Sequence, residues 1–157
     1  MSDAGDLELD AWEHTVESME SLAAERSEEG WATLTVTAAD TAPTPPAVEE
    51  TDRWGLIYTV SSTVSEEFRT VHDAGFDRYD VFRRRVGDRL FLVTELQSRA
   101  ARTAVFIAGA VDVTVADDLI AAAARRGELY THLQLLDWTE LGSVHHDDPT
   151  AFFPSLE

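Results

Sequence analysis

The segment between residues 78 and 111 constrains the fold most, because nearly all of it has a β-strand pattern. Residues 78–86 and 89–97 flank Gly87-Asp88, a two-residue sequence that favours a tight hairpin turn. Residues 103–111 carry apolar side chains on both faces, which is typical of a strand inside a sheet. The segment therefore predicts an antiparallel hairpin followed by a central strand.

Helices and further strands are predicted on both sides of this segment. Apolar residues at spacings of three and four, from Leu9 to Ala23, predict an amphipathic helix that ends near Gly30. Capping boxes that begin at Thr63 and Thr114 predict two more helices, which end near residues 74 and 126. Alternating or apolar runs predict strands at residues 31–38, 54–61, 129–136 and 141–146.

Two segments are predicted to lie outside the sheet. Residues 40–53 hold three prolines and several carboxylates, so we expect an exposed loop that cannot pair with a strand. Residues 147–157 predict a short C-terminal tail, in which Asp148 caps a turn that starts at Pro149. The whole chain, residues 1–157, is then one α+β domain. We expect a mainly antiparallel sheet of about six to seven strands, with about three helices packed mostly on one face.

The charge of the chain predicts a surface adapted to concentrated salt. The formal net charge is −18, with 30 acidic residues, and all 12 basic residues are arginine. Carboxylates keep a protein hydrated where salt screens most repulsion, and arginine pairs with carboxylates better than lysine does. A GC-rich genome is an alternative explanation for the absence of lysine and asparagine, but not for the acidic excess. We therefore predict a halophilic protein.

Absent residue types narrow the chemistry and the location. The chain has no cysteine, which excludes disulfides, thiol nucleophiles and thiolate metal ligands. The longest apolar run, residues 104–111, is far shorter than the roughly 20 residues that span a bilayer. No secretion signal opens the sequence. We expect a cytoplasmic protein with no membrane partner.

Five motifs spread along the chain resemble a known family. They are Glu29-Gly30-Trp31, Asp52-Arg53-Trp54-Gly55-Leu56, Phe91-Leu92-Val93-Thr94-Glu95-Leu96, Tyr130-Thr131-His132-Leu133-Gln134, and His146-Asp147-Asp148-Pro149 through Phe152-Phe153-Pro154. Together they resemble a family of haloarchaeal proteins that is known only as a domain of unknown function. The resemblance agrees with the salt argument and implies no activity.

One candidate site is a polar stripe on a predicted strand. Tyr130, His132 and Gln134 alternate with leucines, so the three side chains share the face opposite the core. Such a face can line a cleft and recognise a small polar ligand. The alternative is an ordinary solvated face.

A second candidate is the arginine-rich hairpin. Residues 78–102 hold seven arginines against three acidic residues, in a chain of net charge −18. Arg83 and Arg85 are the residues expected to bind an acidic protein or a small anionic ligand. The alternative is pairing with carboxylates elsewhere in the chain. The overall charge and the small counterion release in molar salt argue against nucleic acid.

A third candidate is a metal site formed by His132, His146 and Asp148. Imidazole and carboxylate suit zinc or manganese. Neighbouring residues of a strand point in opposite directions, so the site needs His132 from an adjacent strand. The alternative is a surface strand that ends at the Asp148 cap.

These candidates lead to two functional hypotheses. The first is a non-catalytic binding or regulatory protein that acts through the polar face or the arginine hairpin and needs no cofactor. The second is a small metal-dependent hydrolase built on His132, His146 and Asp148. A homodimer is compatible with either hypothesis.

Overall fold

Three α-helices and eight β-strands make up most of the part of the chain that the structure describes. The computed structural model describes residues 4–46 and 53–153. The helices are α1 (Ala4–Glu28), α2 (Ser65–Ala74) and α3 (Asp117–Arg126), with short 3-10 turns η1 (Ser62–Val64) and η2 (Pro149–Ala151). The strands are β1 (Ala32–Thr37), β2 (Asp40–Thr44), β3 (Gly55–Thr59), β4 (Arg78–Val86), β5 (Arg89–Ser98), β6 (Thr103–Asp112), β7 (Leu129–Gln134) and β8 (Glu140–His146).

The strands form two mixed sheets of four strands each. The first sheet has the order β1-β6-β5-β4, and the second has the order β2-β3-β7-β8. In each sheet one pair is parallel, β1 with β6 and β3 with β7, and the other pairs are antiparallel. The α+β class and the three helices are confirmed. The prediction of one antiparallel sheet is wrong.

The division into two sheets begins at a bend after β1. The amide of Ala38 donates to the Ala108 oxygen in the first sheet, at 3.0 Å. The amide of the next residue, Ala39, donates to the Thr59 oxygen in the second sheet, at 2.9 Å. The chain therefore passes from one sheet to the other within two residues, which a hydrophobic pattern does not reveal.

Strand β2 corrects the prediction of an exposed loop over residues 40–53. Residues 40–44 pair with β3, and Pro43 lies opposite Leu56. An edge strand tolerates proline, because the missing N–H can be on the side without a partner, and β2 is at the edge of the second sheet. Residues 47–52 of the predicted loop lie outside the described residues.

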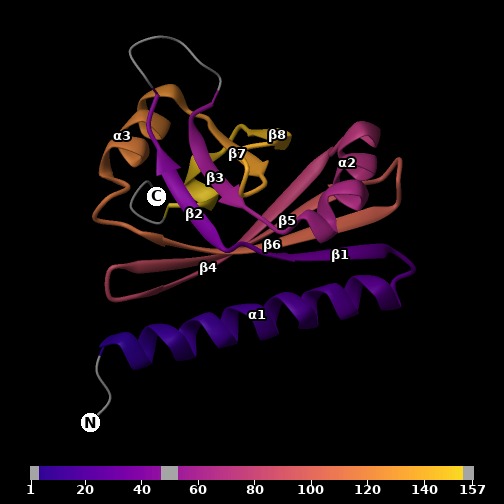
Figure 1. The fold of residues 1–157 in the computed structure, drawn as a ribbon, viewed down its shortest axis with the longest axis horizontal. Helices are drawn as coiled ribbons and strands as arrows, with labels where there is room; N and C mark the ends of the chain where they lie inside the picture. The colour runs from indigo at the N-terminus through magenta and orange to yellow at the C-terminus, as the bar shows by residue number, and fades with distance from the viewer. Residues whose placement is uncertain (1–3, 47–52, 154–157) are drawn as a thin grey trace.

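The layers place helices on both sides of the first sheet. Helix α1 runs along one face of this sheet, whereas the second sheet, α2 and α3 lie on the other side (Figure 1). Two of the helices predicted to share one face, α2 and α3, therefore lie on the same side of the first sheet, and α1 covers its other face. Within the described residues, no helix is both long and apolar enough to cross a lipid bilayer.

Strand β5 shows how the first sheet is buried on both faces. Leu90, Leu92 and Leu96 point into the main core between the sheets. Val93 alternates with them and packs with Met19 of α1 in a separate, smaller cluster. The strand β6 lies between β1 and β5, so its predicted central position is confirmed.

The predicted turns are also confirmed. Gly87 has a φ of +59° in the β4–β5 turn, a conformation that glycine adopts without strain. At the C-terminal end, the Asp148 side chain accepts a hydrogen bond from the Thr150 amide at 3.1 Å. This turn carries Phe152 and Phe153 into the main core.

Candidate functional site

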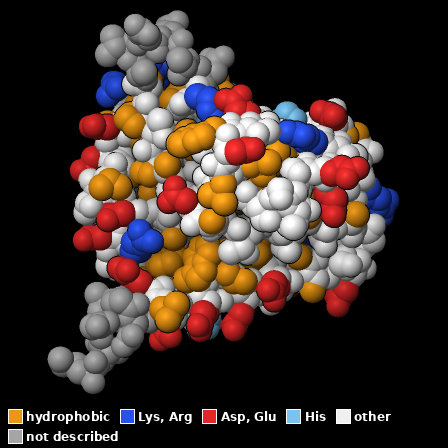
Figure 2. Space-filling view, in the orientation of Figure 1, with side chains coloured by type: hydrophobic (Ala, Val, Ile, Leu, Met, Phe, Trp, Pro, Cys, Tyr) orange, Lys and Arg blue, Asp and Glu red, His pale blue; other side chains and the backbone are white. Residues whose placement is uncertain are grey.

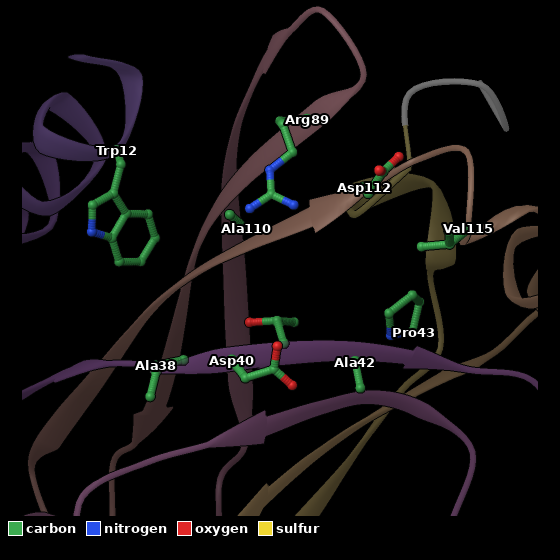
Figure 3. A pocket seen from close by; sticks show the side chains of 11 residues that line it. Trp12, Ala38, Asp40, Ala42, Pro43, Arg89, Ala110, Asp112 and Val115 are labelled. Atoms are coloured by element: carbon green, nitrogen blue, oxygen red, sulfur yellow. The ribbon is translucent and has the colours of Figure 1, made fainter. Parts of the chain in front are cut away.

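A cleft of about 520 Å³ opens where α1, β2 and the ends of β5 and β6 meet (Figure 3). Its size is within the range of small-ligand sites. Its lining comes from four parts of the chain and comprises Trp12, Ala38, Ala39, Asp40, Thr41, Ala42, Pro43, Arg89, Ala110, Asp112 and Val115. The elements that build it are those that join the two sheets.

Small side chains at the sheet junction leave room for the cleft. Ala38 and Ala39 form the bend between β1 and β2, and Ala110 is near the end of β6. Beside Ala110, Gly109 has no side chain, so Tyr58 and Thr41 of the second sheet can approach the backbone of β6. This close approach brings β2 alongside the end of the first sheet.

The guanidinium of Arg89 points into this cleft (Figure 3). Arg89 is the first residue of β5, and its partner across the strands is Asp112. One oxygen of Asp112, Oδ1, accepts from Thr114 twice, from the amide at 2.9 Å and from the hydroxyl at 2.6 Å. Among the described residues, no hydrogen bond or ion pair within 4.0 Å engages the Arg89 side chain.

The pKa of Asp112 agrees with its hydrogen bonds to Thr114. The hydrogen bonds from the Thr114 side chain and amide lower the pKa of Asp112, and the charge of Arg89 contributes more weakly from a distance. Asp112 therefore stays ionised and is held by the turn. Arg89 keeps its donors available to a molecule in the cleft.

Asp40 and Trp12 form other walls of the cleft. Asp40 is exposed at the start of β2, and its carboxylate lies across the cleft from the Arg89 guanidinium (Figure 3). The half-buried Trp12 ring borders the cleft from α1, and its centroid is 6.5 Å from that of Phe91. The cleft thus combines a cation, a carboxylate and an aromatic ring.

The predicted stripe on β7 lies on the outer face of the second sheet. His132 is buried, with ring nitrogens 2.6 Å from Ser143 Oγ and 2.8 Å from the Trp54 oxygen. Gln134 accepts a hydrogen bond from Arg53, and Tyr130 stacks on His132 with centroids 5.8 Å apart. The three side chains share one face; the polar atoms of His132 and Gln134 are hydrogen-bonded within the fold, and the Tyr130 ring packs against neighbouring rings.

The two arginines chosen from the hairpin contact backbone oxygens. Arg83 Nη1 donates to the carbonyls of Thr150 and Ala151, both at 2.8 Å, and so holds the C-terminal turn. Arg85 Nε donates to the Gly87 oxygen at 2.8 Å within its own turn. Neither residue lines the cleft.

The three predicted metal ligands do not converge. His132 projects from the outer face of the second sheet, and His146 projects from its inner face. The Asp148 carboxylate caps η2. Within residues 4–46 and 53–153, no group of three or more histidine, aspartate or glutamate side chains could hold a metal ion.

His146 is fully buried against aromatic rings. Its ring centroid is 4.5 Å from that of Tyr79 and 4.7 Å from that of Phe152, and its Nε2 is 2.8 Å from Thr131 Oγ1. Burial lowers the pKa of His146 to about 3; the charge of His145 adds to this effect, and that of Asp147 opposes it. The ring is therefore neutral in the folded protein near pH 7.

Stability is expected to fall in mild acid because of His146. The unfolded chain binds a proton below about pH 6.5, while the folded chain does not until about pH 3, so the loss grows between these values. We expect this group to lower the free energy of unfolding by about 2 kcal/mol from pH 7 to pH 5. Urea unfolding of the wild type and His146→Gln at both pH values measures it. An equal loss in the two proteins would contradict the prediction.

Sequence reasoning missed the residues that meet in the cleft. Arg89 was counted within the arginine-rich segment but was not distinguished from its neighbours. In the structure, the register of β5 and β6 places Arg89 opposite Asp112. Asp40 was assigned to a loop, and nothing in the local sequence indicates that β2 crosses to this edge.

The fold and the cleft define a small α+β protein with two mixed sheets and a ligand-sized depression where α1, β2, β5 and β6 meet. The chain belongs to DUF7529, a family of unknown function, whose model matches residues 1–154. The match confirms the resemblance to a domain of unknown function. No curated protein and no solved structure matches the chain. The function of this protein is therefore unknown.

Proposed function

We propose that this protein is a non-catalytic binding protein that holds a small ligand in the cleft through an anionic group on Arg89. The observation that carries the proposal is the Arg89 guanidinium, which points into the cleft while Thr114 holds the neighbouring carboxylate. A guanidinium offers a planar pair of donors that matches a carboxylate. An anionic group in the cleft would satisfy donors that are otherwise left to water.

We also propose that this binding takes place in a salt-rich cytoplasm. Asp and Glu side chains follow the lower edge of the face in Figure 2, where α1 runs in Figure 1. In such a chain, of net charge −18, long-range attraction of an anion cannot help binding. At about 1 M salt the screening length is only about 3 Å. Only a direct contact with Arg89 can therefore contribute electrostatic attraction to the binding of an anion.

Replacing Arg89 with glutamine is expected to weaken the binding of a carboxylate by roughly tenfold or more, because a charge-assisted hydrogen bond contributes about 1.5–3 kcal/mol. Titration calorimetry with 3-phenylpropionate in molar KCl measures this effect. The uncharged 3-phenylpropanamide tests whether the carboxylate is needed.

The matched control is Arg69→Gln, which removes the same charge from an exposed site on α2. It should leave the affinity for 3-phenylpropionate within about twofold of the wild type. Equal binding by Arg89→Gln and the wild type would reject the proposal. So would equal affinities for the acid and its amide, or no saturable binding of the acid.

A further inference from the structure

We infer that the ligand of this cleft is a zwitterion of the amino-acid type, with a carboxylate on Arg89, an ammonium group on Asp40 and an apolar body against Trp12. This inference rests on the proposed function, since it keeps Arg89 as the anchor. It adds the class of ligand. Three features of the cleft support it in turn.

The first feature is the position of the Asp40 carboxylate. It lies across the cleft from the guanidinium and extends from a different sheet (Figure 3). No hydrogen bond or ion pair within the described part of the chain engages the Asp40 side chain. A cation and an anion that face each other without touching can each bind one end of a short zwitterion.

The second feature is the balance of charge around the cleft. Among the described residues that line the cleft, Arg89 is the one cation, and Asp40 and Asp112 are the two carboxylates. A phosphate monoester with about two negative charges would bind one arginine but be repelled by both carboxylates. A zwitterion has no net charge, so the field of the −18 chain does not oppose its entry. Charge therefore favours a zwitterion over a nucleotide.

The third feature is the apolar part of the lining. The Trp12 ring borders one side, and its contact with Phe91 restricts its orientation. Val115 and Pro43 supply further apolar surface on the other side (Figure 3). Each methylene of a ligand that is buried in the cleft adds about 0.8 kcal/mol to the binding free energy. A ligand with an apolar side chain is therefore expected to bind more tightly than one with only a hydrogen atom at that position.

Four probes of one shape test the inference by calorimetry in molar KCl. L-Phenylalanine carries both charges, 3-phenylpropionate only the anion, L-phenylalaninamide only the cation, and 3-phenylpropanamide neither. We expect L-phenylalanine to bind at least about fivefold more tightly than 3-phenylpropionate, and the other two more weakly still. Asp40→Asn should weaken L-phenylalanine by roughly tenfold and leave 3-phenylpropionate within about twofold.

The outcomes separate this inference from the function on which it rests. The inference of a zwitterionic ligand is wrong if 3-phenylpropionate binds through Arg89 as tightly as L-phenylalanine, or if Asp40→Asn weakens the binding of neither probe. The proposed anion site on Arg89 is unaffected by either result. If no carboxylate binds, or Arg89→Gln is silent, both proposals fail. Glu66→Gln, on the exposed face of α2, is the control for loss of a carboxylate and should not change any affinity.

Discussion

Replacing Gly109 with valine is expected to destabilise the protein by at least about 3 kcal/mol, at the high end of overpacking effects in a core. A Cβ atom at this position would be 2.5 Å from Cε1 of Tyr58 and 2.6 Å from Oγ1 of Thr41. Tyr58 is fully buried, so its ring cannot turn outward into solvent. Gly109 belongs to the first sheet and its two neighbours to the second, so the substitution would push the sheets apart.

Ala110→Val is the matched control for this prediction, because it adds methyl groups to the next residue of the same strand. Ala110 faces the open cleft, where there is room for a larger side chain. We expect its cost to stay below about 1 kcal/mol. Urea unfolding of both variants in molar KCl gives the two free energies. Similar losses in the two variants would show that the close approach at Gly109 does not limit the packing of the sheets.

The elements that the sequence predicts well are those whose signals are local. The hairpin around Gly87-Asp88 depends on neighbouring residues alone, and the turn conformation agrees with it. The α3 helix ends at Gly127, which adopts the left-handed conformation with a φ of +66°. In both cases the residues that decide the structure lie within a few positions of each other.

The partition of the strands into two sheets could not be predicted in the same way. The parallel pairs join β1 to β6 and β3 to β7, strands that are separated by more than sixty residues in sequence. Hydrophobic patterns show that a strand has a buried face but not which strand lies beside it. Pro43 also gave a misleading signal, because an edge position removes the usual penalty for proline in a strand.

The residues of the candidate cleft could not be predicted from the sequence for a related reason. Its groups come from α1, β2, β5 and β6, so no motif contains them. The arginines stand out in the sequence by their density along residues 78–102, whereas their contacts distinguish them in the fold. Arg83 is held by two carbonyls, and Arg89 is left to the cleft. Thr114 donates two hydrogen bonds to Oδ1 of Asp112, the residue opposite Arg89.

Helix α1 covers a buried glutamate, Glu95, on the first sheet. Glu95 is 1% exposed on the face of β5 that packs against α1. Its Oε2 accepts from Arg26 Nε at 2.6 Å and from Gln97 Nε2 at 3.0 Å. The hydrogen bond to Glu95 raises the pKa of Arg26, which stays charged. Since a buried carboxylate is costly without a cation, Arg26 is expected to fix the position of α1 on the sheet.

Arg26→Met is therefore expected to destabilise the docked helix by about 3–5 kcal/mol, the cost of leaving a buried charge without its partner. The methionine keeps most of the apolar stem, so the loss reports the missing guanidinium. Adding Glu95→Gln removes the buried charge and keeps an acceptor for Gln97. The double variant should recover at least about 2 kcal/mol of the loss.

Two measurements decide whether this ion pair holds the helix. Urea unfolding in molar KCl gives the global loss, and hydrogen exchange of the α1 amides detects release of the helix alone, because α1 packs in a cluster separate from the main core. Glu29→Gln is the control, since Glu29 contacts the same arginine at 3.0 Å but its side chain is 54% exposed. Its loss should be below about 0.5 kcal/mol. If Arg26→Met costs no more than this control, or if Glu95→Gln does not rescue it, apolar contacts of residues such as Met19 hold α1 and the buried charge has no part in its docking.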